Sequence, residues 1–569
     1  MEGSKMDQVT FTEEDMLASH LGELVDKCVA EHGEKPSVSC ILPTGHSHTL
    51  SFADIGRMSD AVASYLREDL GLKPGEVVAI QCPNTLAYPV LAFGIFKAGL
   101  VATNVNPLYT TEETNHQLRD SGAKVWFVID VFGDRIKQSI EGTSVDRVYT
   151  LSLVDLFPKV QRALLGFALK YLKKAVPPLN APVAGTLSDV LKAGMKHMAR
   201  GVSVSAYQAG KNHSDVAIFQ YTGGTTGRSK GAELTHGNVV GNISQANKRD
   251  DGIERGDAES LLLVLPLYHV YALAVGMLNS MYTGVHVVLV PVPRPLSNLK
   301  PVFEKFDITV MPGVNTLYLG LMQEEWFVSN PPKTLRYCFS GAAPLQPATA
   351  QRWEELTGAS IYEGYGLTEG TCVVSSMPLN RPPKRGTCGI PIPGTEIRIV
   401  DDEGNEVPSG QPGELWIRGP QIMRGYLNNP DATSSTIVEG GWLMTGDVAV
   451  VDDEGYLAIV DRKKDMVIVS GFNVFPTDIE DVLTRFDKVA EAAVVGAPDL
   501  ESGEKVVAYI VKRDESLTES EVIAHCREHM TGYKVPKTIC FINELPKSPV
   551  GKVLRRELRG MARADAEGN

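Results

Sequence analysis

The stretch from Tyr221 to Gly231, YTGGTTGRSKG, concentrates groups that could do chemistry. Its glycines let the backbone approach a ligand closely, and its three threonines and one lysine add hydroxyl and ammonium donors. Such a loop suits a polyphosphate. It is not the GxxxxGK[ST] phosphate loop, because Lys230 is followed by glycine. A flexible surface turn remains the alternative for this segment taken alone.

Two later segments place further candidates at the ends of strands. LRYCFSGAAPL (335–345) predicts a strand followed by a turn of small residues, which would leave room for a flat ligand. ASIYEGYGLTEG (359–370) predicts a strand, a glycine turn and then Thr368 and Glu369. A threonine and a glutamate at the carboxyl end of a strand could hold phosphate and Mg²⁺ through their oxygens. The alternative is an ordinary helix-capping pair.

The last third of the chain adds charged candidates. Asp447 follows Thr-Gly, and a charged cluster runs from Asp461 to Asp465 without apolar periodicity, which favours a hinge. Lys552 follows a Pro/Gly loop tip in PKSPVGKVLRR and could equally be an exposed tail lysine. His269 lies in an apolar run, where a histidine is usually a satisfied core residue.

The elements that must position these residues predict an α/β fold. The apolar run 216–219 predicts a buried strand directly before the glycine loop. Strands are also expected at 77–82, 125–130, 286–291 and 308–314, and helices over 50–70 and 87–102. Short alternating strands and helices favour a doubly wound, mostly parallel sheet.

The domain prediction has two parts. Residues 1–461 form a large N-terminal domain of doubly wound sheets, in which 386–461 is a small antiparallel or barrel β subdomain with Gly/Pro/Asn turns. Residues 462–569 form a mobile C-terminal α+β domain.

Composition excludes several classes of protein. With 569 residues the chain exceeds one core, and its net charge of −14 argues against a nucleic-acid partner. Eight scattered cysteines indicate a reducing compartment. No run of 18 apolar residues, no signal-peptide pattern and no peroxisomal address is present. We expect a cytoplasmic protein.

Residues 151–200 form an amphipathic insertion with two open interpretations. Over 153–176, Val160, Leu164, Phe167 and Tyr171 fall near one helix face among five basic residues. Such a segment can lie on the inner face of the plasma membrane as a peripheral anchor. The alternative is a helix packed on its domain with a solvated basic side.

Taken together, the motifs resemble the adenylate-forming superfamily of acyl-CoA synthetases, luciferases and peptide-synthetase adenylation domains. YTGGTTGRSKG, SGAAPL, YEGYGLTE, GWLMTGD, VDRKKDM, SGFNVFPTDIE and PKSPVGKVLRR occur in the order and spacing of that family. The resemblance covers about residues 20–560. In their detailed residues, the motifs are most similar to those of bacterial long-chain fatty acid–CoA ligases. It implies that ATP and a carboxylate give an acyl-adenylate and pyrophosphate, after which coenzyme A displaces AMP.

The resemblance also implies roles for residues. Lys552 would meet the carboxylate, with Thr226 and Glu369 as further catalytic residues, and Glu369 and Thr225 would bind Mg²⁺. Lys464 would be the hinge of a rotating C-terminal domain, and Gly471 would line the tunnel for coenzyme A. The remaining nucleotide contacts would be the phosphate-side residues Thr222, Gly223, Gly224, Thr225, Thr226, Gly227 and Lys230, the adenine-side residues Gly341, Ala342, Ala343, Tyr365 and Gly366, the α-phosphate residue Thr368, and the ribose residues Asp447 and Arg462.

The identity of the acid is less fixed. Pro-Leu-Tyr-His-Val-Tyr at 266–271 lacks the aspartate that holds an amino group in peptide-synthetase domains, which disfavours amino acids. Small residues Gly313, Thr316 and Gly320 would leave an extended channel, which favours a long-chain fatty acid. Medium-chain and aryl acids remain alternative substrates, and His269 could gate the access of the acid. The protein could form a homodimer. An alternative from a different class is a non-catalytic protein that binds or takes up fatty acids.

Overall fold

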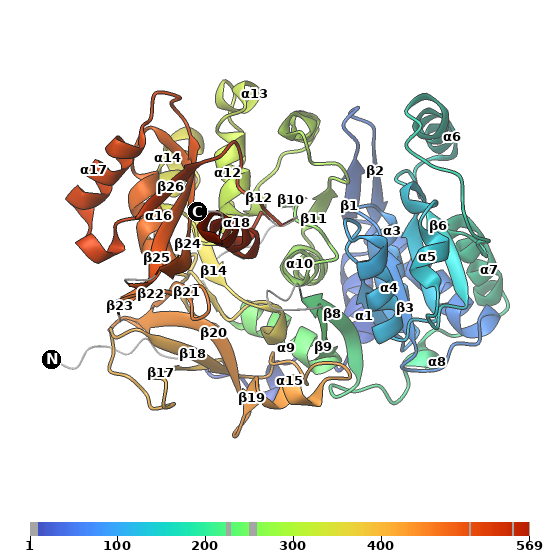
Figure 1. Cartoon of the computed structure of the whole chain (residues 1–569). Coiled ribbons are helices and arrows are strands. Elements are labelled where there is room, and N and C mark those ends of the chain that lie inside the picture. The colour runs from blue at the N-terminus through green and yellow to red at the C-terminus, as the bar shows by residue number, and fades with distance from the viewer. Residues whose placement is uncertain are drawn as a thin grey trace.

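The computed structural model describes residues 9–222, 229–249, 259–470, 472–499, 502–548 and 551–567 (Figure 1). The predicted residues Gly223, Gly224, Thr225, Thr226, Gly227 and Gly471 lie outside the described residues. Within the described part, the chain forms two large mixed sheets, a smaller antiparallel sheet and a C-terminal α+β unit.

The first large sheet has the strand order β7-β6-β5-β3-β4-β8-β9 among the described residues. Its pairs are parallel except for β8 with β9, which form a hairpin around the glycine loop. The strands are β3 (Val77–Gln81), β4 (Val101–Asn104), β5 (Val125–Ile129), β6 (Arg147–Leu151), β7 (Gly185–Thr186), β8 (Val216–Thr222) and β9 (Lys230–Thr235).

The second large sheet has the order β16-β15-β14-β13-β12-β10-β11-β1-β2 in the part of the chain that the structure describes. Its centre is parallel and both of its edges are antiparallel. The strands are β1 (Pro36–Ile41), β2 (Ser47–Ser51), β10 (Ser260–Leu263), β11 (His286–Leu289), β12 (Val310–Gly313), β13 (Tyr337–Ser340), β14 (Ile361–Tyr365), β15 (Ser375–Ser376) and β16 (Ile390–Pro391).

One apolar core joins the two sheets through α1 (Leu21–His32), α2 (Phe52–Ser64), α3 (Ala87–Lys97) and α9 (His236–Lys248). The all-round apolar α3 is completely buried, as its sequence requires. The other helices of the two sheets are α4 (Thr111–Asp120), α5 (Ile136–Ile140), α6 (Lys159–Phe167), α7 (Leu187–Ala199), α8 (Ser205–Gln208), α10 (Asn279–Thr283), α11 (Lys300–Lys305), α12 (Asn315–Leu321), α13 (Glu325–Val328) and α14 (Pro347–Thr357), together with the π-helices η2 (Tyr65–Asp69), η4 (Ala168–Leu172) and η5 (Ala272–Leu278).

The β subdomain is an open antiparallel sheet rather than a barrel, because its described strands pair as β17-β18-β20-β19 with β21 on β20. It begins at residue 396, ten residues later than the sequence predicts, since β16 belongs to the second large sheet. Its elements are β17 (Glu396–Val400), β18 (Gly413–Arg418), α15 (Pro430–Ser434), β19 (Ile437–Val438), β20 (Trp442–Val451) and β21 (Leu457–Arg462).

The C-terminal unit begins beyond β21 and has apolar cores of its own. It lies against the rest of the molecule, orange to red in Figure 1. Its elements are β22 (Val467–Val469), β23 (Phe472–Val474), α16 (Pro476–Thr484), β24 (Val489–Asp499), β25 (Gly503–Lys512), α17 (Glu519–His529), β26 (Thr538–Phe541) and α18 (Arg555–Glu567). Separate cores are what two domains joined by a short connection require.

Candidate functional site

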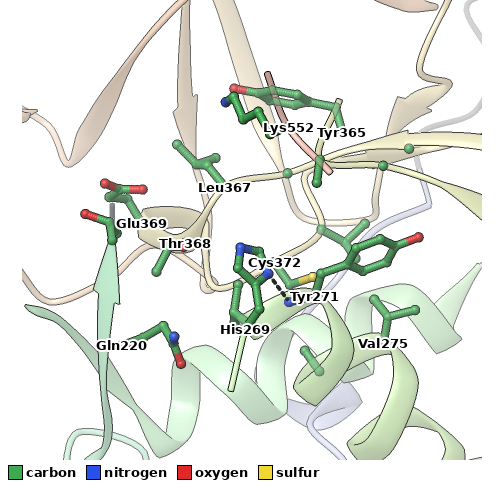
Figure 2. Close-up of a pocket in the computed structure, with 18 of the residues that line it drawn as sticks. Gln220, His269, Tyr271, Val275, Tyr365, Leu367, Thr368, Glu369, Cys372 and Lys552 are labelled. Atoms are coloured by element: carbon green, nitrogen blue, oxygen red, sulfur yellow. Dashed lines mark hydrogen bonds between the residues drawn. The ribbon is translucent and has the colours of Figure 1, made fainter. Parts of the chain in front are cut away.

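A cavity of about 1400 Å³ lies where the two large sheets, the β subdomain and the C-terminal unit meet. Side chains from all four parts line it, and Figure 2 labels examples from both large sheets and from the C-terminal unit. Most of the predicted site residues that the structure describes are found in its wall: Thr222, Lys230, Gly341, Ala342, Tyr365, Gly366, Thr368, Glu369, Asp447, Arg462, Lys464 and Lys552. Ala343 does not line the cavity. After Ala342, the next residues that line it are Tyr362 to Gly366, on and just after β14.

The carboxyl ends of β13 and β14 form one wall. Ala342 has a φ of +64°, a left-handed conformation that turns the chain sharply away after Ser340 and Gly341. A Cβ on Gly366 would lie 1.5 Å from the carbonyl oxygen of Cys372, so only glycine fits there. Gly341, Ala342 and Gly366 all line the cavity at these strand ends.

Asp447 also lines the cavity, with a side chain that is only 7% exposed. Its Oδ2 accepts a hydrogen bond from the Tyr365 hydroxyl at 2.5 Å, and its Oδ1 lies 3.3 Å from Nε of Arg462. The register of β20 and β21 places Asp447 directly opposite Arg462. Burial and the neighbouring Asp447 carboxylate raise the pKa of Tyr365, which keeps its hydroxyl a donor.

Glu369 and Lys230 lie on either side of Tyr426. Tyr426 donates a hydrogen bond of 2.7 Å to Oε1 of Glu369, and the Lys230 ammonium lies 4.1 Å from the centre of the Tyr426 ring. Burial and the Glu369 charge raise the pKa of Tyr426. Tyr426 therefore contacts both a cation and an acidic side chain of the cavity wall.

A carboxylate in this position suits Mg²⁺, which is commonly held by one or two carboxylates together with substrate phosphates. Within the described residues, no group of three His, Cys, Asp or Glu side chains could hold a metal by itself. Glu369 would therefore need phosphate oxygens as co-ligands, which agrees with its place near Lys230 and Thr222.

Lys552 reaches the cavity from the C-terminal unit, where it pairs with Ser548. The Ser548 Oγ accepts the Lys552 N–H at 3.1 Å, and the Ser548 N–H donates to the Lys552 carbonyl at 2.8 Å. Burial, followed by the positive charge of Arg462, lowers the pKa of Lys552 to about 7. Figure 2 labels Lys552 and Tyr365 among the side chains that line the pocket.

His269 lies in the cavity wall between the nucleotide-side residues and the apolar branch. Its Nδ1 accepts the N–H of Tyr271 at 3.3 Å, the dashed line in Figure 2. Burial, and secondly the charge of Lys552, lower the pKa of His269 to about 4, so the ring is neutral near pH 7. A neutral ring that accepts at Nδ1 must carry its proton on Nε2, which makes Nε2 a donor.

Apolar side chains form another part of the wall, which we call the apolar branch: Leu261, Val310 and Phe339 from the sheet, and Ala274 and Val275 from η5. Insertions of π-helix are frequent at functional sites. The prediction that Gly313, Thr316 and Gly320 keep this channel open is wrong: none of them lines the cavity. Instead, Gly313 makes room for the Tyr318 ring and Gly320 for Leu296.

Sequence reasoning missed three residues of the site. Glu363 lines the cavity, and burial raises its pKa to about 8, while its carboxyl group accepts the Leu345 N–H. Gln220 donates to the carbonyl of Tyr268, and so joins β8 to the segment that carries His269. Tyr426 comes from a turn 57 residues beyond Glu369. Glu363 and Gln220 stand out as polar residues near the carboxyl ends of apolar strands, but only the fold brings Tyr426 to the site.

Comparisons with known proteins agree with this geometry. The family described as AMP-binding enzyme matches residues 25–427, and the AMP-binding enzyme C-terminal domain matches residues 478–552. The chain is 41% identical to a long-chain-fatty-acid–CoA ligase of Escherichia coli O6:H1, over 96% of this chain and 95% of that protein. It is also 32% identical to a 4-coumarate-CoA ligase of Narcissus pseudonarcissus, over 92% of this chain and 91% of that protein.

Solved structures share the architecture. The anthranilate CoA ligase AuaEII in complex with anthranoyl-AMP has a TM-score of 0.84 at 26% identity, covering 98% of this chain and all of that one. ATP-bound MatB from Rhodopseudomonas palustris has a TM-score of 0.80 at 27% identity, covering 95% of this chain and 98% of that one. The fold expected from the motifs is therefore confirmed, and the chain belongs to the AMP-binding enzyme family.

Proposed function

We propose that the protein ligates a long-chain fatty acid to coenzyme A with ATP, through an acyl-adenylate, and releases AMP and pyrophosphate. The observation that carries this proposal is the place of Lys552, partly buried in the wall of the cavity that also holds Thr368, Glu369, Asp447 and the apolar branch. A carboxylate whose alkyl chain fills that branch would present its oxygens to the lysine and to the α-phosphate. Relatives that are 41% identical and named long-chain-fatty-acid–CoA ligase support the choice of acid.

In this proposal the phosphates of ATP lie by Thr222 and Lys230, the base lies over Gly341 and Ala342, and Asp447 accepts hydrogen bonds from the ribose hydroxyls. Thr368 would contact the α-phosphate. The attack of a carboxylate on a phosphate brings two anions together, so fixed positive charge at Lys552 stabilises the transition state. Mg²⁺ held by Glu369 would supply charge neutralisation to the phosphates.

The thioester step would use a second position of the C-terminal domain. We place the domain boundary between Asp461 and Arg462, with Lys464 as the hinge. Supporting observations are the end of β21 at Arg462, one residue past this boundary, and the separate cores of the unit beyond it. A turn of the domain about this hinge would withdraw Lys552 and bring the SGFN segment, with Gly471, to the cavity for coenzyme A.

Thioester formation across a series of acids tests the proposal. We expect activity to rise from butyrate to the long saturated and unsaturated acids, because each buried methylene contributes about 0.8 kcal/mol. Benzoate and cinnamate should be poor substrates, with kcat/KM values at least ~100-fold below that of oleate, about the ratio that 2.7 kcal/mol supplies. A preference for either aryl acid would overturn the choice of substrate class.

The charge of Lys552 predicts a pH dependence. Below its pKa of about 7 the lysine is protonated, and above that value the free enzyme loses the charge. We therefore expect kcat/KM for adenylation to fall as the pH rises through 7, whereas kcat stays level to higher pH because bound anions favour the protonated form. Lys552→Arg should remove the fall in kcat/KM, since arginine keeps its charge. A kcat/KM that increases through pH 7 would indicate a general base instead.

His269 predicts a selective effect on the acid. In this proposal its Nε2–H donates to the substrate carboxylate, and hydrogen bonds to charged groups contribute about 1.5–3 kcal/mol. His269→Ala should lower kcat/KM for oleate roughly 10- to 100-fold in pyrophosphate exchange, with the KM for ATP nearly unchanged. His269→Gln, which keeps an N–H donor, should recover part of the loss. Equal losses for both variants would point to a packing role.

Glu369 predicts a dependence on Mg²⁺. Glu369→Gln keeps the shape and the Tyr426 contact but removes the negative charge. We expect the Mg²⁺ concentration for half-maximal pyrophosphate exchange to rise by roughly tenfold, the lower end of the loss typical for a metal-site residue. Glu354→Gln, at an exposed ion pair with Arg385, is the control and should leave the requirement unchanged. An unchanged Mg²⁺ requirement in Glu369→Gln would remove this carboxylate from the metal site.

We also propose that the enzyme acts at the inner face of the plasma membrane as a peripheral protein, with no nucleic-acid partner. A bilayer is where long-chain acids accumulate, because their alkyl chains partition out of water. Within the described residues, no helix combines the length and hydropathy needed to cross a membrane.

A further inference from the structure

The helical stretch formed by α6 and η4, residues 159–172, stands at the rim of the molecule (Figure 1). One side of it is anchored: Leu165 and Leu169 are partly buried against the main core, and Arg162 donates to the Ser188 hydroxyl at 2.8 Å. The orientation of the stretch is therefore fixed by the protein.

The opposite side of the same stretch is apolar and open to water. Its large side chains are between 57% and 73% exposed: Val160, Leu164, Phe167, Tyr171 and Leu172. The first four are spaced i, i+4, i+7 and i+11, which places them in one stripe along the helix. The stretch packs on its domain and exposes its lysines, as the alternative predicts, but its outward face also carries this apolar stripe. Grouped exposure of this kind marks an interaction surface.

Positive charge surrounds the stripe. Lys159, Lys170, Lys173 and Lys174 are all exposed, whereas the acidic residue of this segment, Asp155, is buried. This local charge is opposite to the net charge of −14 of the whole chain. The Lys170 ammonium lies 5.6 Å from the centre of the Tyr171 ring. Tyr171 combines an apolar ring with a polar hydroxyl group, as is typical of residues at the interface between an apolar phase and water.

We propose that this face, which we call the α6 face, docks in the interfacial region of an anionic lipid bilayer. The inference rests on the proposed function, since a long-chain acid is held in the same bilayer. The stripe would enter the headgroup region, and the lysines would meet anionic headgroups. With 14 residues, the stretch is too short to span the hydrocarbon core, which takes about 20 residues.

A second copy of this chain is a less suitable occupant. A two-fold interface brings the same patch of both copies together. Four lysines would then face four identical lysines across the contact, which is unfavourable. An anionic surface offers the complementary charge instead.

Vesicle flotation of the full-length protein tests the α6 face. The probes are vesicles of phosphatidylcholine alone and of phosphatidylcholine mixed equally with phosphatidylglycerol. We expect binding to the mixed vesicles, weakened by salt, and much less to the neutral ones. Leu164→Gln with Phe167→Gln should reduce the partition coefficient at least ~10-fold, because both apolar side chains would lose their burial in lipid.

Two triple variants that each remove three positive charges test whether vesicle binding depends on the charges of the α6 face or only on the net charge of the protein. Lys170→Gln, Lys173→Gln and Lys174→Gln together should reduce binding to anionic vesicles roughly 100-fold. Lys192→Gln, Lys196→Gln and Arg200→Gln remove the same charge from the neighbouring α7 segment, whose side chains are exposed too, and should leave binding close to that of the wild type. Equal losses in the two triple variants would overturn the proposal.

Two further outcomes would also overturn it. One is unchanged vesicle binding of the Leu164/Phe167 variant; the other is a dimer in size-exclusion chromatography that this variant converts to a monomer. Thioester formation with octanoate in the absence of lipid should be unchanged in every variant, which confirms that each is folded. If no acid gives a thioester in the wild type, the proposed function fails. The flotation experiment still tests, independently of that result, whether the α6 face docks on an anionic bilayer.

Discussion

Lys552→Ala is expected to abolish acyl-adenylate formation and to spare the transfer of an acyl group from supplied acyl-adenylate to coenzyme A. The lysine is partly buried in the cavity wall, where in the proposed function its charge meets the reacting carboxylate in the first step. Removing a preorganised charge or donor of this kind typically costs about 10²–10³-fold in kcat. Pyrophosphate exchange dependent on oleate measures the first step, and thioester formation from synthetic oleoyl-AMP measures the second.

The matched control for this experiment is Lys488→Ala. Lys488 belongs to the same C-terminal unit but pairs with Glu521 on α17, outside the cavity. We expect both half-reactions of this variant to stay within about twofold of the wild type, as surface substitutions usually do. Equal losses of both half-reactions in Lys552→Ala would contradict the assignment, because they would indicate a general effect on folding or on binding.

Asp447→Asn is expected to have the second-largest effect. The carboxylate holds the Tyr365 hydroxyl and Arg462, and would accept the ribose hydroxyls. Hydrogen bonds to a charged acceptor contribute about 1.5–3 kcal/mol each, so kcat/KM for ATP should fall roughly 100-fold in pyrophosphate exchange. The KM for the fatty acid should change much less.

Comparison of ATP with 2′-deoxy-ATP makes the test of Asp447 specific. The wild type should prefer ATP by roughly tenfold or more, as expected for one lost hydrogen bond to a charge. The Asp447→Asn variant should largely lose that preference, because the partner of the missing hydroxyl is weakened already. If the variant discriminates between the two nucleotides as well as the wild type does, Asp447 does not contact the ribose.

The strands were predictable because each is short, apolar and bounded by turn residues. The runs at 125–130 and 286–291 became β5 and β11 within two residues. The run 87–102 shows the limit: it was predicted as one helix, but α3 ends at Lys97 and residues 101–104 form β4. Gly99, with a φ of +68°, makes the turn, and an apolar run of this length does not by itself separate a buried helix from a buried strand.

The site was predictable to the extent that its residues belong to continuous motifs. Thr368, Glu369, Asp447, Arg462 and Lys552 all reach one cavity, although almost 200 residues separate the first from the last. What the sequence could not indicate is the contact of Tyr426 with Glu369, since it depends on how the β subdomain folds back. The same holds for Gly313 and Gly320, whose small size serves the packing of other side chains rather than the channel.

The most direct test of the central claim is a single turnover of the enzyme with oleate and ATP, first without coenzyme A and then with it. We expect oleoyl-AMP and pyrophosphate to form in equal amounts on the enzyme, and added coenzyme A to convert the adenylate into oleoyl-CoA and AMP. Lys552→Ala should fail at the first stage only. Release of ADP and phosphate, or AMP formation that does not require the fatty acid, would contradict the account.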